Sequence, residues 1–224
     1  MFKVKLIFSV FVLSACCFTT SSIAKTVLFD FHISSSAMGD AGLAFDDAES
    51  SVSYLDPISG LSITAEAFLD GVSGGTDLNG TGNNGYFGVN AAGSGDDTDQ
   101  LDGANGTESI VFSFSEDVTL LSMDFNAFGG SGGSGEDRVS ISISSGFSTT
   151  MDGNDFTNDL FETSQLISTA DTLTIAWVDG GGVGLQSLSV DFTPAIVPEP
   201  STYAAIFGLL AFGLTVSYRR RHKS

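Results

Sequence analysis

Residues 108–125 read ESIVFSFSEDVTLLSMDF, and they carry the clearest structural signal in the chain. Ile110, Phe112 and Phe114 occupy alternate positions, and a period of two is typical of a β-strand with one buried face. Glu116 and Asp117 then supply a turn, after which residues 118–125 continue in an extended pattern. This stretch therefore predicts two strands joined by a short turn.

Other stretches of the middle region show a similar strand-like pattern, and clusters of Gly, Asn and Asp separate them. The further candidate strands are 27–33, 51–55, 61–69, 86–90, 139–143, 173–177 and 185–192, the last with one register break. About ten short strands with turns between them predict an all-β fold, an antiparallel β-sandwich of jelly-roll-like type. The 19 Phe residues of the chain offer large apolar surfaces for its core.

The first 24 residues have the layout of a secretory signal peptide. Lys3 and Lys5 precede the apolar run 6–18, and the small-residue pattern Ser22-Ile23-Ala24 follows it. The apolar run is shorter than the roughly 20 residues that a membrane-spanning helix needs. We therefore expect residues 1–24 to be removed by cleavage after Ala24.

Both cysteines of the chain, Cys16 and Cys17, lie in this leader. Leu13-Ser14-Ala15-Cys16 also resembles a lipobox, in which Cys16 would be acylated and become the new N-terminus, so two modes of processing stay open. Cleavage after Ala24 would leave a mature chain without a disulfide, a thiolate metal site or a cysteine nucleophile.

Charge is distributed very unevenly. Of the eight Lys and Arg residues only Lys25 and Arg138 lie between residues 25 and 194, whereas all 27 Asp and Glu except Glu199 lie there. The middle region thus sets 26 acidic residues against 2 basic ones. Such a surface repels nucleic acid, whose binding depends on Lys and Arg contacts to phosphate, so we expect no nucleic-acid partner.

The last 30 residues, 195–224, differ from the middle region. Val197-Pro198-Glu199-Pro200 is stiff because proline restricts its own backbone and that of its predecessor. Residues 202–218 carry no charge and predict one transmembrane helix, roughly 25 Å long. Arg219, Arg220 and Arg221 open a basic end, 219–223, which predicts a stop-transfer signal kept in the cytoplasm.

This tail resembles the PEP-CTERM sorting signal of Gram-negative bacteria, in which a Val-Pro-Glu-Pro motif, a short apolar span and an Arg-rich end follow one another. The resemblance implies that the chain is a substrate of exosortase, a membrane protease, with Val197, Pro198, Glu199 and Pro200 as the recognised residues. Residues 95–103 and 108–114, and the closing stretch 185–190, are also similar to recurrent segments of ectodomains that carry this tail. That similarity implies a β-sandwich without naming its ligand.

An acidic loop offers a candidate metal site. Asp96, Asp97, Asp99 and Asp102 crowd together among glycines, and carboxylate oxygens are the ligands that calcium prefers. The spacing is not that of an EF-hand, and a solvated acidic turn stays the alternative. Residues 132–139 fit a single calcium-binding nonapeptide, but one copy cannot build a β-roll, so a plain hairpin loop is favoured there.

Signals for catalysis are weak. The only histidines are His32 and His222, so a Ser-His-Asp triad or a zinc site lacks its components. A pair of carboxylates for glycoside hydrolysis stays open, because sequence does not reveal their separation. Trp177 and Tyr86 are the only hints of a sugar-stacking surface, and the alternation of Trp177 with Leu173 and Ile175 favours core packing instead.

These observations predict a signal peptide at 1–24, an acidic ectodomain at 25–194 and a sorting tail at 195–224. We expect a non-enzymatic protein of the cell surface or the exopolysaccharide matrix, anchored in the inner membrane before processing. The alternative is a carbohydrate-binding, lectin-like module that holds exopolysaccharide, with calcium bound at Asp96–Asp102.

Overall fold

The computed structural model describes residues 23–31, 50–74, 76–79, 87–91, 100–126, 137–152, 159–194 and 200–221. The chain divides into two compact units. One is a β-domain, Ile23–Pro194, and the other contains the helix α2 in the C-terminal region.

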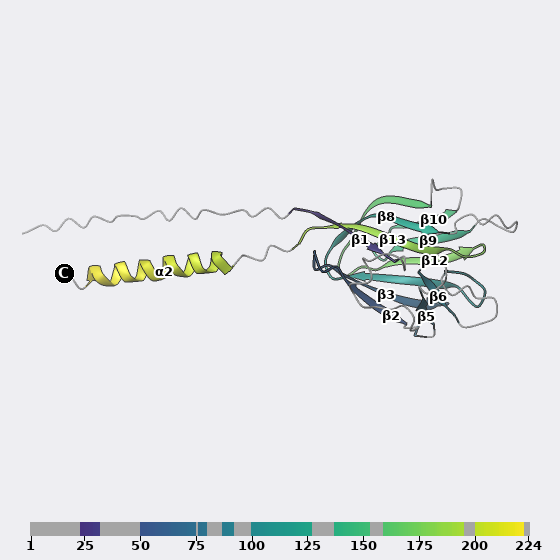
Figure 1. The fold of residues 1–224 in the computed structure, drawn as a ribbon, viewed down its shortest axis with the longest axis horizontal. Helices are drawn as coiled ribbons and strands as arrows, with labels where there is room; N and C mark the ends of the chain where they lie inside the picture. Colours follow the sequence, from purple (N-terminus) through teal and green to yellow (C-terminus); the bar gives the residue numbers. More distant parts are fainter. Residues whose placement is uncertain are drawn as a thin grey trace, which may run out of the picture. The chain divides into compact units, whose positions relative to one another are not determined.

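The described residues form short strands and one helix (Figure 1). Their bounds are β1 Lys25–Asp30, β2 Ser51–Leu55, β3 Ser62–Leu69, β4 Val72–Ser73, β5 Asp77–Asn79, β6 Gly88–Asn90, β7 Glu108–Phe114, β8 Val118–Asn126, β9 Arg138–Ile143, β10 Ser148–Asp152, β11 Leu160–Ile167, β12 Leu173–Asp179, β13 Gly184–Phe192 and α2 Pro200–Arg221.

Two antiparallel sheets make up most of the β-domain. The small sheet has four strands in the order β1-β13-β8-β11. The large sheet has seven, in the order β10-β9-β12-β7-β3-β2 with β4 paired to β3, while β5 and β6 form a separate pair. Every strand pairing is antiparallel. The all-β prediction is therefore confirmed.

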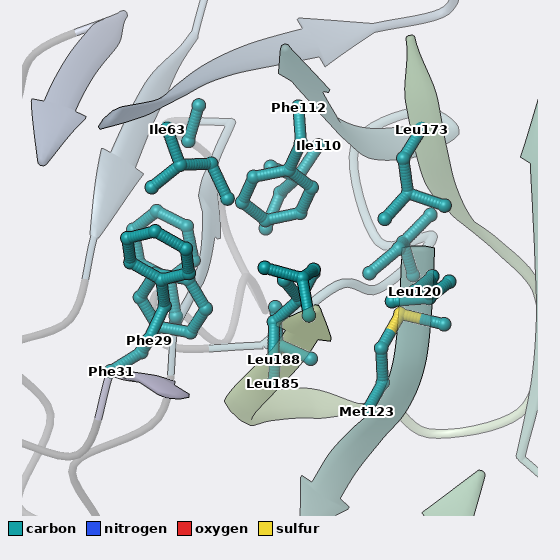
Figure 2. Packing of buried hydrophobic residues seen from close by; sticks show 14 of the residues in the cluster. Phe29, Phe31, Ile63, Ile110, Phe112, Leu120, Met123, Leu173, Leu185 and Leu188 are labelled. Carbon is teal, nitrogen blue, oxygen red and sulfur yellow. The ribbon is translucent and has the colours of Figure 1, made fainter. Parts of the chain in front are cut away.

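The core lies between the two sheets and arises from alternation along the strands. In β3, Ile63, Ala65 and Ala67 are buried while the residues between them are partly exposed, as expected where successive side chains point to opposite faces. The inward residues of both sheets belong to one hydrophobic cluster. Figure 2 shows Phe112 of β7 and Leu120 of β8 within this cluster, one from each sheet.

A group of aromatic rings occupies one part of the core. The Phe31 and Phe87 rings are stacked with centroids 4.9 Å apart, and Tyr54 meets Phe31 edge to face at 5.8 Å. Phe112 lies 5.9 Å from Phe31. Such pairs add stability beyond the burial of their area. Burial raises the pKa of the Tyr54 hydroxyl, because the charged form would lose its hydration.

Different turns and connections of the chain lie at the two ends of the β-domain. We call the end where β1 begins at Lys25 and β13 finishes at Phe192 the junction end; Lys25 lies directly opposite Phe192. The turns between consecutive strands at this end are 56–61, 115–117, 144–147 and 168–172. We call the opposite end, which holds residues 100–107 and 180–183, the distal end.

The strands predicted from alternation are present, with small shifts at their ends. The register break expected in 185–192 is confirmed, because the pairing of β13 with β8 shifts between Leu185 and Ser187 and again between Ser189 and Val190. The prediction did not include β4, β5, β10 or β11. Burial in β11 does alternate, but Thr163 and Gln165 occupy the partly buried positions between Phe161 and Ile167, so the hydropathy of the sequence shows no period of two.

Candidate functional site

The C-terminal helix α2 begins at Pro200, the last residue of the predicted sorting motif, and continues to Arg221. Proline suits the first turn of a helix, because the N–H that it lacks would have no partner there. The described side chains at 206–215 are all exposed, and apolar residues occur on all sides of the helix rather than on one face. Arg219 is exposed near the C-terminal end of α2. Val197, Pro198 and Glu199 lie outside the described residues.

A helix thus occupies the position of the predicted transmembrane segment, 202–218. In the part of the chain that the structure describes, however, no helix has both the length and the apolar character that crossing a membrane requires. The membrane-spanning character predicted for residues 202–218 is therefore without support from the structure.

The predicted signal-cleavage residue lies immediately before the first strand. Ile23 and Ala24 are exposed and belong to no strand, and β1 begins at Lys25. Leader residues 1–22, including Cys16 and Cys17, lie outside the described residues.

A buried polar arrangement occupies the distal end, next to the predicted calcium loop. Glu108 has no exposed surface and is the first residue of β7. Its Oε2 accepts a hydrogen bond of 2.8 Å from the backbone N–H of Asp102, itself only 4% exposed. Asp102 Oδ1 in turn accepts from the N–H of Ala104 at 2.8 Å. The two carboxylates thereby fix the path of the chain into β7.

The segment around Asp102 is joined to the β12–β13 connection by a short bridge. Leu101 and Val183 exchange two backbone hydrogen bonds, of 2.7 and 3.0 Å. Close to this bridge Gly182 has φ +127°, and a Cβ there would overlap the Gln100 side chain. Glycine is favoured at this position by the backbone angle, whereas the overlap is with the end of the Gln100 side chain, which could move aside.

Asp137 is a further buried carboxylate at the distal end, 4% exposed and directly before β9. Its Oδ1 accepts a hydrogen bond of 2.6 Å from the N–H of Gly181. Gly180, with φ +101°, lies so close that a Cβ would overlap Asp137, including its backbone. The β12–β13 connection is therefore held against the start of β9 by contacts that only glycine permits.

Trp177 is partly buried and packs against the core, the packing that its alternation favoured. Its side chain packs against the main hydrophobic cluster, and Gly103 lies directly against its ring. The sugar-stacking interpretation of Trp177 therefore has no structural support, and Tyr86 lies outside the described residues.

The predicted calcium ligands are only partly visible. Asp96, Asp97 and Asp99 lie outside the described residues, and Asp102 is engaged in the hydrogen bond to Ala104. Within the described parts of the chain no group of three or more His, Cys, Asp or Glu side chains could hold a metal ion. Calcium binding at Asp96–Asp102 thus stays a prediction.

Carboxylates at the two ends differ in their electrostatic surroundings. At the distal end, desolvation followed by repulsion from Asp159 and Asp30 raises the pKa of Asp124. At the junction end, hydrogen bonds chiefly from the Ser168 hydroxyl lower the pKa of Asp171. Partial desolvation raises the pKa of Asp56, but hydrogen bonds from Ser59 and Ile58 outweigh it and lower the pKa overall.

Glu108 and Asp137 were not predicted as buried carboxylates, although the sequence holds a signal for each. Glu108 lies two and four positions before Ile110 and Phe112, and Asp137 lies two positions before Val139. Because residues two apart in a strand face the same side, each acid was predictable as an inward side chain at the first position of its strand or just before it.

No protein-family model matches the chain, and no curated protein matches it significantly. The tail and the geometry of the β-domain are therefore the basis for a functional assignment.

Proposed function

We propose that the protein is exported, held at the inner membrane by its C-terminal tail, and delivered to the cell surface or the exopolysaccharide matrix after an exosortase-type protease has processed that tail. Its jelly-roll-like β-domain would act there without catalysing a reaction. The tail carries this proposal, because its three parts follow in the order of a PEP-CTERM signal.

One structural observation supports the proposal in particular. The helix α2 begins at Pro200, so residues 197–199 immediately precede a helix whose described side chains from Ile206 to Thr215 are exposed and uncharged. A helix with apolar residues on all sides does not suit a water-facing surface. A lipid environment would satisfy it, and the exposed Arg219 at its end would favour the cytoplasmic side.

The start of the β-domain agrees with removal of a leader. Ile23 and Ala24 are exposed, whereas the side chains of Val27 and Phe29 are already buried in the core. Cleavage after Ala24 would therefore leave β1 whole, and the mature chain would keep every core residue of β1.

The proposal is tested by replacing residues 197–200 with Gly and Ser in the full chain. We expect the altered protein to stay unprocessed in the membrane fraction, while the parent chain is released with a lower mass. Pro194→Ser, which changes a proline outside the motif, is the matched control and should be processed normally.

Normal release of the 197–200 variant would contradict the assignment. The mass of the released parent chain also fixes both processing points, and so distinguishes cleavage after Ala24 from acylation at Cys16.

A further inference from the structure

The outermost strands of a β-sheet carry backbone groups that no neighbouring strand pairs. In the large sheet these strands are β2 and β10. β2 pairs with β3 in an unbroken register, from Ser51 opposite Glu66 to Leu55 opposite Ser62. On its other side β2 pairs with no strand that the structure describes. It is therefore an edge strand.

The hydrogen bonds around β2 show which of its backbone groups point to the open side. The N–H of Ala67 in β3 donates to the carbonyl of Ser50, directly before β2. In an antiparallel pair, hydrogen-bonded and non-bonded positions alternate. The backbone N–H and C=O groups of Ser51, Ser53 and Leu55 therefore point away from β3. All three residues are exposed.

β2 also lacks the features with which natural edge strands avoid pairing, namely charged side chains, prolines and bulges. The outermost strands of the small sheet both carry charges, Lys25 and Asp30 in β1 and Glu162 in β11, where the register also shifts. β10 ends in Asp152. β2, Ser51–Leu55, contains no charged residue and no proline, and its register has no shift. Two copies of the chain can therefore meet at β2 with little local repulsion.

We propose that β2 is a self-association edge, at which it pairs antiparallel with β2 of a second copy about a two-fold axis. The inference concerns the β-domain alone and goes beyond the proposed function, because it does not depend on how the tail is processed. An axis at Ser53 places the two Ser53 residues opposite each other and Ser51 of each copy opposite Leu55 of the other. Each copy then offers the N–H and C=O groups of these three residues to the other. Such a contact is self-complementary, as two-fold symmetry requires.

The side chains of β2 suit this register. Val52 and Tyr54 are buried on the inner face of the sheet. The pairing places Val52 of one copy beside Tyr54 of the other, and pairs of aromatic and β-branched residues stabilise neighbouring strands. On the outer face, Leu55 is 58% exposed and would be partly covered by the second copy. A contact of five residues is small beside the roughly 1,200 Å² that stable complexes bury, so association should be weak and should depend on concentration.

The charge of the domain determines how this association responds to salt. Residues 25–194 contain 26 acidic and 2 basic side chains, so two copies repel each other. At 0.1 M salt such repulsion acts over about 10 Å, and more salt shortens that distance. Hydrogen bonds between uncharged backbone groups are not screened in this way. Association at β2 should therefore strengthen as the salt concentration rises.

The test uses the full chain with Cys16→Ala and Cys17→Ala, which removes its only two thiols, in a mild detergent that covers the exposed apolar side chains of α2. Ser53→Cys places one thiol at the proposed axis. Thr150→Cys is the matched control, an exposed residue in the middle of β10 at the other edge of the same sheet. Mild oxidation should yield at least about fivefold more disulfide-linked dimer from Ser53→Cys, because pairing at the axis brings two Cα atoms to about 5.5 Å, within the range of a disulfide. The yield should rise with salt.

A proline variant distinguishes strand pairing from collision. Ser51→Pro removes an N–H that β3 does not use, so the domain should keep its fold. The dimer yield from Ser53→Cys should nevertheless fall to that of Thr150→Cys. Ser148→Pro, at the first residue of β10, is the control and should leave the yield unchanged. Melting temperatures check that both proline variants are folded.

Hydrogen exchange gives a second readout that needs no substitution. The amide protons of Ser51, Ser53 and Leu55 should exchange quickly in dilute protein and more slowly as its concentration rises. Protection already present in dilute protein would show that the same chain covers the edge, and would overturn the inference. Equal dimer yields from Ser53→Cys and Thr150→Cys would overturn it too, as would a yield that Ser51→Pro leaves unchanged in a folded chain.

Discussion

The junction end and the distal end use the same chemical group in opposite ways. At the junction end, Asp56 and Asp171 accept hydrogen bonds within short turns, and those bonds favour their charged forms. At the distal end, Glu108 and Asp137 are buried and Asp124 lies among other carboxylates. Burying a carboxylate costs free energy unless hydrogen bonds or charges compensate it. Carboxylates at the junction end therefore close short turns, while Glu108 and Asp137 at the distal end accept backbone hydrogen bonds in buried surroundings.

The largest expected difference in stability is between glycine-to-alanine variants at the two ends. Gly60 at the junction end and Gly180 at the distal end both have positive φ, but only Gly180 would bring a Cβ into overlap with backbone, that of Asp137. Gly60→Ala should lower the free energy of unfolding by about 1 to 2 kcal/mol, from backbone strain alone. Gly180→Ala should cost about 1 to 3 kcal/mol more, because the overlap adds to the strain. Denaturant unfolding measures both, and equal losses would argue against close packing at the distal end.

A smaller difference in stability loss is expected between the alanine variants of Glu108 and Asp56. Glu108→Ala removes the acceptor of the buried Asp102 N–H, which should cost about 1 to 3 kcal/mol. Asp56→Ala frees N–H groups of an exposed turn, where water replaces the lost acceptor, so the cost should be smaller. Glu108→Gln keeps an oxygen at the same place and should recover most of the loss. A Glu108→Gln variant as unstable as Glu108→Ala would show that charge, not the hydrogen bond, matters.

The smallest effects should appear in the pH dependence of stability. Because the pKa of Asp124 is raised on folding, its charge destabilises the folded state at neutral pH, and this cost disappears as the pH falls to the unfolded value. Asp124→Asn should therefore raise the melting temperature at pH 7 and change little near pH 3.

Asp171 should behave in the opposite sense. Its folded pKa is lowered, so its stabilising contribution is present above the unfolded pKa and is lost as the pH falls through the folded value. Asp171→Asn should lower the melting temperature at pH 7, and the loss should shrink in acid. Melting curves from pH 3 to 7 would show the two variants shifting in opposite directions; shifts of the same sign would contradict the distinction between the two ends.

Alternation along individual strands predicted the all-β class and most strands of both sheets. It succeeded where inward positions are apolar, as in β7 and β9, where every second residue is buried. It failed for the short strands β4 and β5, for β10, an edge strand with no buried residue, and for β11, where Thr163 and Gln165 occupy partly buried positions. A periodic hydropathy signal exists only where the regularly covered positions are also apolar.

The arrangement at the distal end could be predicted only in part. The positions of Glu108 and Asp137 in the alternating pattern indicate inward side chains, but the Gly181–Asp137 hydrogen bond and the Leu101–Val183 bridge join segments far apart in the chain. No local pattern encodes such contacts, because they follow from the pairing order of the sheets. The role of Asp96, Asp97 and Asp99 as calcium ligands stays a prediction, because these residues lie outside the described parts of the chain.

The pairing of β1 with β13 has a consequence for the time at which the domain acquires its final structure. Thr26 and Asp191, which are hydrogen-bonded across this pair, lie 165 positions apart in the chain, and among the described strands β1 pairs with β13 alone. Contacts of such long sequence separation form late, since the loop that they close costs much entropy. The small sheet therefore cannot be completed until nearly the whole domain has been synthesised. A nascent chain whose small sheet is still incomplete can stay unfolded for longer. An unfolded chain is the state that a narrow translocation channel accepts, so late completion of this sheet suits the proposed export.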